Sequence, residues 1–468
     1  FIHAEFFAQT AGTVSSHGTI LKSDNARHSS SFAAYAPVWK TTGQPIARRK
    51  ARPIAFTATQ PELSWGIIAN IIPTRDGTSL DASRHLCPSV RGESPMIKSL
   101  RHLAIAGLLL PVCLPLAAAT PGLSNKVQQS LKANKISSQS LSVVTVPLNG
   151  PGNSTYFNAD ISVNPASTMK LVTTYAALEL LGPTHQWKTE FFTDGQLKNG
   201  VLNGNLYLKG GGDPKLNMEK LWLMMRDLRA NGVLQVTGDL VLDRSHFVQP
   251  QLPSFNDDGG DANKPFLVAP DSLLVNLKAL RFIARTEGGK VHIAAEPPIA
   301  SIRIDNRVKA LPAAKCPGWP DVRYNPVTEF DGTTVIVTGK LAEGCSSQTY
   351  LSLLDHPGYA AGAIRAIWQE LGGSIMGKDR LAPVPEKARL LARAYSPDLT
   401  EIIRDINKYS NNTMARQLFL SLGAQFRNSA DQDDSKAAQR VIRSWLARKG
   451  ITAPHLVMEN GSGLSRAE

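Results

Sequence analysis

Cysteine is scarce in this 468-residue chain, which contains only four. Cys87 and Cys113 precede residue 120, so the rest of the chain contains only Cys316 and Cys345. No cluster of Cys and His has the spacing of zinc ligands, and we expect neither a metal nor another cofactor. An even pair in an exported protein indicates one Cys316–Cys345 disulfide, the alternative being two buried thiols.

Hydrophobic runs long enough to span a membrane and blocks of like charge are also absent from the sequence. Hydrophobic residues make up 42% and charged residues 19%, which excludes a wholly disordered chain, a collagen-like fibre, a coiled-coil rod and a multi-span membrane protein. The net charge is +13, but 12 basic and 6 acidic residues lie within 1–119, which leaves +7 for the remainder. Because no Lys/Arg block gathers this excess, we expect a solvated surface and no nucleic-acid partner.

Methionine is missing from the first 95 residues and first occurs at Met96. There it opens a short basic segment, followed by an apolar run of 14 residues and three alanines, which are the three parts of a secretory signal peptide. The run is too short to cross a bilayer as a stable helix, and the alternative of a buried core helix is disfavoured because its two prolines would break such a helix. We expect residues 96–119 to be an export signal and the protein to be periplasmic. Residues 1–95 are then upstream sequence translated from a mis-set start, the alternative being a disordered extension.

Beyond residue 119 the hydrophobic pattern changes twice. Residues 120–195 predict a helix, a β-hairpin and a second helix, at 125–135, 141–158 and 171–181. Residues 196–394 are β-rich, with strand patterns at 201–209, 233–243, 273–285, 291–294, 333–341 and 348–353 and helical patterns at 216–230 and 359–371. Residues 395–468 predict helices at 399–408, 412–422 and 434–449. The sequence therefore predicts a mixed α/β (α+β) fold.

A serine and a lysine stand three positions apart, just before the predicted helix at 171–181. Asn164 can cap this helix and Pro165 suits its first position, so Ser167 should lie in the first turn, where backbone N–H groups favour negative charge. One helical turn brings the side chains of Ser167 and Lys170 to the same face. A neutral lysine there can take the serine proton and make the hydroxyl a nucleophile. The alternative is a helix-start serine beside a solvated lysine.

A second polar motif, Ser410-Asn411-Asn412, lies between two predicted helices. A hydroxyl and an amide at this spacing can relay a proton and hold a peptide carbonyl, although a helix cap has the same composition. Ser-x-x-Lys and Ser-x-Asn occur together in penicillin-binding proteins and serine β-lactamases, with Lys-Thr-Gly as the third element.

Four motifs follow one another along the chain, at residues 164–170 (Asn-Pro-Ala-Ser-Thr-Met-Lys), 210–214 (Gly-Gly-Gly-Asp-Pro), 409–412 (Tyr-Ser-Asn-Asn) and 461–466 (Gly-Ser-Gly-Leu-Ser-Arg). With them, the chain from about residue 125 resembles the D-alanyl-D-alanine carboxypeptidase/endopeptidase family of the penicillin-binding protein 4 type. The resemblance implies a penicillin-binding transpeptidase-like domain, with helices around an antiparallel sheet, formed by residues 120–195 and 395–468. A large β-rich insertion at 196–394 interrupts it.

The resemblance also implies a serine D,D-peptidase. It would remove terminal D-alanine from peptidoglycan stem peptides and cleave D-Ala–diaminopimelate cross-links, and β-lactam antibiotics would inhibit it covalently. Ser167 is then the nucleophile, Lys170 the general base, Ser410 a proton relay and Asn412 a holder of the substrate backbone. Contact with the membrane surface or cell wall and assembly into a homo-oligomer are compatible with this function.

Further substrate contacts are implied by the same family. An acidic residue five positions before an aromatic one meets the amino end of the diaminopimelate side chain, and Asp261 and Phe266 have this spacing. The alternative is a polar loop that Phe266 anchors in the core. Arg466 matches a family arginine near the side-chain carboxylate, which a guanidinium binds with two hydrogen bonds.

No Lys-Thr-Gly, or variant of it, occurs between Ser410 and Glu468. The segment Lys-Thr-Thr-Gly at residues 40–43 has one residue too many to match Lys-Thr-Gly, and it lies in the upstream stretch 1–95. We therefore expect the chain to stop short of its natural end, before this third motif. Two other functions stay open, a non-catalytic peptidoglycan-binding scaffold and a serine β-lactamase. The β-lactamase is disfavoured by the long insertion and by the lack of a Glu-x-x-Leu-Asn segment that could supply its deacylating base.

Overall fold

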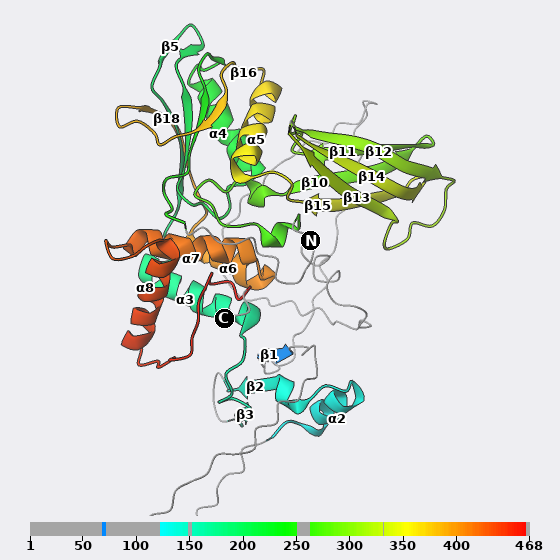
Figure 1. The fold of residues 1–468 in the computed structure, drawn as a ribbon, viewed down its shortest axis with the longest axis vertical. Coiled ribbons are helices and arrows are strands. Elements are labelled where there is room, and N and C mark those ends of the chain that lie inside the picture. Colours follow the sequence, from blue (N-terminus) through cyan, green and yellow to red (C-terminus); the bar gives the residue numbers. More distant parts are fainter. Residues whose placement is uncertain (1–67, 72–121, 148–151, 250–262, 331, 465–468) are drawn as a thin grey trace, which may run out of the picture.

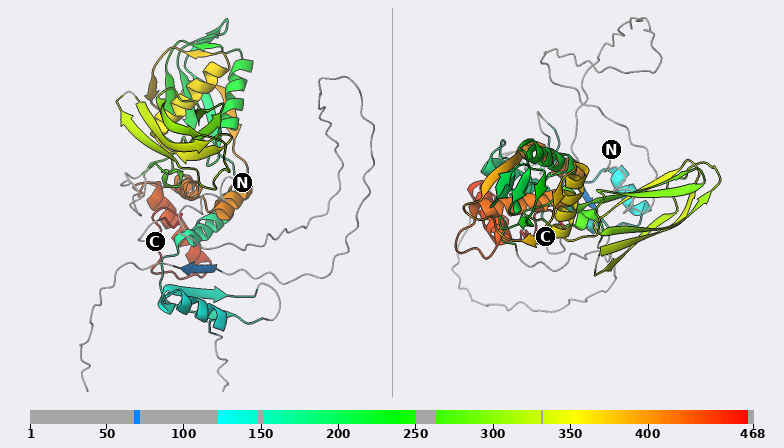
Figure 2. Two further views of the ribbon diagram at one scale, coloured as in Figure 1. Left: turned by 90° about the vertical axis from the view of Figure 1, so that its right-hand side faces the viewer. Right: turned by 90° about the horizontal axis from the view of Figure 1, so that it is seen from above.

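The computed structural model describes residues 68–71, 122–147, 152–249, 263–330 and 332–464. They form three tiers along the longest axis of the molecule (Figures 1 and 2). A small sheet with one helix lies at one end, a layer of helices in the middle and a β-rich domain at the other end. None of the described helices is both long and apolar enough to cross a membrane. The expected export signal lies outside the described residues.

The first tier consists of α2 (Asn125–Ala133), β2 (Leu141–Thr145), β3 (Thr155–Phe157) and the short strand β1 (Ile68–Ile71). β2 pairs antiparallel with β3 on one side and with β1 on the other. The predicted hairpin is thus confirmed. β1 belongs to the stretch 1–95 that we expected to lie outside the working protein, yet it takes part in this sheet.

The middle tier consists of α3 (Met169–Leu181), α6 (Leu399–Tyr409), α7 (Asn412–Phe426) and α8 (Asp434–Arg448). α3 precedes the insertion and the other three helices follow it, but α3 packs against all of them (Figure 1). The helices pack together because each has an apolar face. On α6, for example, Leu399, Ile402 and Ile406 recur at helical spacing and are fully buried. These residues join Met169 and Phe419 in one hydrophobic cluster, so segments from both sides of the insertion share a core.

The β-rich domain contains four sheets among the described residues. A five-stranded sheet has the order β17–β9–β7–β4–β18, with its strands at Asp379–Leu381, Leu240–Asp243, Leu206–Gly210, Lys188–Thr193 and Arg389–Tyr395. A four-stranded sheet has the order β16–β8–β6–β5, at Ser374–Ile375, Gln235–Val236, Val201–Asn203 and Gln196–Lys198. The sheet β11–β10–β15 lies at Lys290–Glu296, Leu280–Glu287 and Ser346–Leu351, and the sheet β12–β14–β13 at Ile302–Leu311, Gly332–Ala342 and Val322–Glu329. These last two sheets project sideways from the domain (Figure 1).

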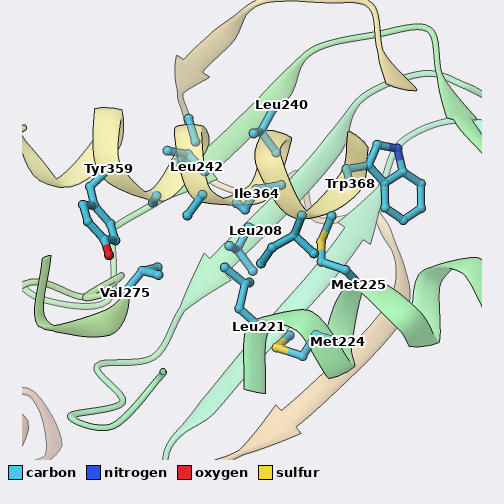
Figure 3. Packing of buried hydrophobic residues seen from close by; sticks show 14 of the residues in the cluster. Leu208, Leu221, Met224, Met225, Leu240, Leu242, Val275, Tyr359, Ile364 and Trp368 are labelled. Carbon is cyan, nitrogen blue, oxygen red and sulfur yellow. The ribbon is translucent and has the colours of Figure 1, made fainter. Parts of the chain in front are cut away.

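Two helices, α4 (Met218–Ala230) and α5 (His356–Glu370), build the core of this domain with the five-stranded sheet (Figure 3). Leu208 and Leu242 from the strands meet Leu221 of α4 and Ile364 of α5, and all four are almost completely buried. Each such side chain contributes about 2 kcal/mol through its removal from water. The insertion therefore has a hydrophobic core of its own, separate from that of the helical tier.

Several sequence-based boundaries are corrected by the structure. β4 begins at Lys188, where the sequence also turns β-rich, and it pairs with both β7 and β18 of the insertion. The strand expected at 273–285 begins only at Leu280, since residues 276–278 form a left-handed turn. β12 and β13 had not been predicted. The Cys316–Cys345 disulfide is present, in agreement with the expectation.

Candidate active site

Ser167 lies in a 3₁₀ turn, Ala166–Thr168, that leads directly into α3. This corrects the expectation that it occupies the first α-helical turn. Ala166 adopts a left-handed conformation with φ 44°, which a continuous right-handed helix cannot contain. The Asn164 side chain stabilises the turn by accepting a hydrogen bond of 2.8 Å from Ala166 N–H, and so does not cap α3 itself. Strained backbone of this kind is typical of functional sites.

Lys170 is almost completely buried, with 2% of its surface exposed. Its Nζ lies 3.0 Å from Ser167 Oγ, 2.6 Å from Asn412 Oδ1 and 2.7 Å from the carbonyl oxygen of Ser462. The two carbonyl-type oxygens can only accept, whereas the serine hydroxyl can donate or accept. Lys170 Nζ can donate to all three oxygens, and Ser167 Oγ is the one of these partners that can also donate its proton to an unprotonated amine.

The three residues of the Ser-x-Asn motif have different structural roles. Ser410 is the C-cap of α6, with φ 51°, and Asn411 caps α7 by accepting a hydrogen bond of 2.9 Å from Met414 N–H. Asn412 opens α7 and directs its Oδ1 at Lys170. The capping function is therefore met by Asn411. Since Oδ1 of Asn412 must face the lysine, its amide N–H groups are the ones left to bind a substrate carbonyl.

A glycine-rich segment at 460–463 closes the site from the other side. Gly461 accepts a hydrogen bond of 2.7 Å from Thr173 of α3 through its carbonyl oxygen, and the neighbouring carbonyl of Ser462 accepts from Lys170. A side chain at Gly463 would overlap the carbonyl oxygen of Ala166. This segment thus packs directly on the backbone of the Ala166–Thr168 turn, which contains Ser167.

We expect Gly463→Ala to destabilise the site far more than Gly450→Ala. Both glycines have positive φ, 75° and 72°, so each substitution costs about 1–2 kcal/mol in backbone strain. A Cβ at Gly450 meets no atom within 4 Å, whereas the one at Gly463 must displace the Ala166 backbone. Thermal unfolding and acylation by a fluorescent penicillin are the measurements. Equal loss in both variants would show that close packing at 463 does not hold the nucleophile turn.

A cavity of about 580 Å³ opens beside Ser167, between the helical tier and the β-rich domain. Ser167, Ser410 and Asn412 line it together, so the structure brings both sequence motifs to one space. Its further walls come from both domains and include Phe266, Lys215, Asp405 and Leu277. Such a cavity can admit an extended peptide side chain next to the nucleophile.

The predicted substrate contacts are only partly described. Phe266 lies in a 3₁₀ turn, Pro265–Leu267, and lines the cavity, as a substrate-contacting residue should. Asp261 and Arg466 lie outside the described residues. Their roles remain predictions.

Sequence reasoning missed two contributions to the site. The carbonyl of Ser462 is a backbone group, so no residue type marks it, although the two flanking glycines signal close backbone approach. Lys215 at the cavity wall binds Glu401 and Asp405, which are 186 and 190 positions away. No local pattern could have joined them.

The chain is similar in sequence to known D-Ala-D-Ala carboxypeptidases. The sequence model of the D-Ala-D-Ala carboxypeptidase 3 (S13) family matches residues 123–468. A D-alanyl-D-alanine carboxypeptidase of an Actinomadura species is 32% identical over 317 residues, which cover 64% of this chain and 57% of that protein. The D-alanyl-D-alanine carboxypeptidase DacB of Haemophilus influenzae is 26% identical over 328 residues, covering 66% and 64%.

The fold is also similar to a solved structure. Penicillin binding protein 4 from Haemophilus influenzae aligns with a TM-score of 0.54 and 24% identity, over 67% of this chain and 69% of that one. The present chain spans less than two thirds of the length of the two relatives named above. The family match nevertheless covers most of the chain and includes all the residues of the candidate site that the structure describes. The chain belongs to the D-Ala-D-Ala carboxypeptidase 3 (S13) family.

Proposed function

We propose that the protein is a serine D,D-peptidase that acts on peptidoglycan stem peptides through an acyl-enzyme on Ser167. It would remove terminal D-alanine as a carboxypeptidase and cleave D-Ala–diaminopimelate cross-links as an endopeptidase. The observation that carries the proposal is the buried Lys170 amine, 3.0 Å from the Ser167 hydroxyl and held by two carbonyl-type oxygens. Family membership supplies the substrate class.

In the first half-reaction, Lys170 takes the proton of Ser167 as Oγ attacks the carbonyl carbon of the penultimate D-alanine. Backbone N–H groups, including that of Ser167, stabilise the oxyanion that forms. The amide N–H groups of Asn412 hold the peptide backbone. Lys170 needs no large movement for this step, because its three hydrogen-bond partners already fix its position.

To complete this first half-reaction, the tetrahedral intermediate collapses to the acyl-enzyme, the C–N bond breaks and the departing amine must gain a proton. Ser410, which lines the same cavity as Ser167, donates it and is reprotonated from the Lys170 ammonium. The leaving amine is free D-alanine or the cross-linking diaminopimelate. Water then hydrolyses the serine ester and restores the hydroxyl. Asp261, Phe266 and Arg466 would select the diaminopimelate side chain.

Location and inhibition follow from the same proposal. Export by the segment 96–119 would place the protein in the periplasm, where its substrate lies, and N-terminal sequencing of the processed protein should begin just after Ala117–Ala119. β-Lactams, which present a strained amide to the same serine, would acylate it covalently.

The function is tested with a fluorescent penicillin and with two stem-peptide substrates. We expect a long-lived covalent adduct, release of D-alanine from a pentapeptide and cleavage of a cross-linked dimer. Rapid turnover of the penicillin would instead indicate a β-lactamase, and the absence of any adduct a non-catalytic scaffold. A D-alanine release without dimer cleavage would restrict the function to carboxypeptidase activity.

A further inference from the structure

A single lysine of the inserted domain reaches across to the helix that carries Ser410. Lys215 Nζ lies 2.8 Å from Glu401 Oε1 and 2.7 Å from Asp405 Oδ2, which are one turn apart on α6. Asp405 stands five residues before Ser410, about 7.5 Å along the helix axis. Although partial burial opposes the charged form, the hydrogen bonds to Asp405 and Glu401 raise the pKa of Lys215 above the usual lysine value. Lys215 thus keeps its positive charge at neutral pH.

The backbone of Lys215 is held in place by further hydrogen bonds. Its backbone N–H donates to Asp213 Oδ1 over 2.8 Å, and Asp213 is buried and also paired with Lys220. Lys220 in turn donates to the carbonyl oxygen of Tyr395, at the end of β18. The lysine that holds α6 is therefore fixed to the sheet of the inserted domain.

A second contact lies beside the first. Residues 276–278 are three successive non-glycine residues with left-handed φ values of 49°, 50° and 54°, a conformation that non-glycine residues normally adopt only singly. Asn276 N–H donates to the carbonyl oxygen of Leu216, next to Lys215, over 2.7 Å. Leu277 then packs on the hydrophobic cluster of the helical tier. Lys215 and Leu277 both line the cavity, so one docking unit joins the two domains there.

We propose that Lys215 is a positioning residue for acylation, which holds α6 and its C-terminal Ser410 in register with Ser167. The inserted domain is then a working part of the peptidase site and not a separable module. This inference rests on the proposed function. Its physical basis is that α6 ends at Ser410, whose N–H and that of Asn411 both donate to the carbonyl oxygen of Ile406. A displacement of α6 would move the hydroxyl that must protonate the leaving group.

The experiment compares Lys215→Met with Lys449→Met in the full chain. Lys449 is a matched control, because it also pairs with a glutamate, Glu179, and its side chain is 33% exposed against 31% for Lys215. The first measurement is the rate constant of acylation by a fluorescent penicillin, determined separately from the binding constant of the penicillin. The second is the rate of hydrogen exchange at the backbone amides of Ser410 and Asn411. We expect Lys215→Met to acylate roughly tenfold to hundredfold more slowly, the effect of a misplacement of about 1 Å.

In the same variant, the two amides should exchange faster and penicillin binding should change less than acylation. Lys215→Arg, which keeps the charge, should recover most of the rate. Lys449→Met should resemble the parent in both measurements. Acylation of Lys215→Met at the rate of the control would overturn the proposal. If the parent itself forms no adduct, the proposed function fails, and unchanged amide exchange in Lys215→Met would then overturn the positioning role separately.

Discussion

Replacing Ser167 by alanine should abolish covalent labelling by penicillin and release of D-alanine while leaving the fold intact. In the proposed mechanism the oxygen of this hydroxyl forms the acyl bond, and it lies 3.0 Å from the Lys170 amine. Ser167 caps neither its own 3₁₀ turn nor α3, so its removal costs no capping hydrogen bond. Labelling is followed by fluorescence in a denaturing gel and stability by thermal unfolding.

Ser462→Ala is a suitable control for this experiment. Ser462 lies in the same site and is fully buried, but it contacts Lys170 through its backbone carbonyl, which alanine retains. Ser462→Ala should keep its labelling, although it loses two hydrogen bonds of the hydroxyl, one of 2.6 Å donated to Asn460 Oδ1 and one of 3.2 Å accepted from Leu464 N–H. Persistent labelling of Ser167→Ala would remove Ser167 from the mechanism.

Replacing Lys170 by arginine should slow acylation by roughly 10²–10⁴-fold, the range typical of a lost general base. A guanidinium stays protonated in proteins and cannot accept the serine proton. It also has to fit a site with 2% exposure, so the variant could lose activity through crowding alone. Lys170→Met separates the two causes, because it keeps the length of the side chain without either the charge or the basic nitrogen.

Both Lys170 variants should acylate slowly, and Lys170→Met should unfold at a temperature no lower than Lys170→Arg. Pre-steady-state mixing with a fluorescent penicillin gives the acylation rate. Acylation of Lys170→Met at nearly the normal rate would mean that another group takes the proton and that the assignment of Lys170 is wrong.

The helices and many strands of the insertion were predictable from the sequence, while β12, β13 and the order of the strands within the sheets were not. Helices such as α6 follow from local information, apolar residues at helical spacing together with end signals. β13 escaped because Pro326 interrupts its pattern, and the structure shows why the proline is tolerated, since β13 is an edge strand of its sheet. The start of β10 escaped because a tertiary hydrogen bond, from Asn276 to Leu216, holds the preceding residues in a left-handed turn.

The candidate site shows the same division. Ser167, Lys170 and Asn412 carry their chemistry in their side chains and occur in spaced motifs, so the sequence predicts them, and the structure brings them within hydrogen-bond distance. Ser462 contributes a carbonyl oxygen that any residue could supply at that place. Lys215 depends on partners contributed by a distant helix. Neither a backbone carbonyl nor an ion pair between distant residues produces a recognisable pattern in the sequence.

The pairing of β4 with β18 has a consequence for the order in which the chain folds. Leu181, where α3 ends, and Leu399, where α6 begins, are 218 positions apart, but Lys188 and Tyr395 lie opposite each other in the inserted sheet. Once that sheet forms, only nine residues, 182–187 and 396–398, connect the two helices to the paired strands. This shortening lowers the entropic cost of closing the helical core by roughly 2–3 kcal/mol. The insertion therefore acts as an internal template, and its folding should precede the assembly of the helices that surround the nucleophile.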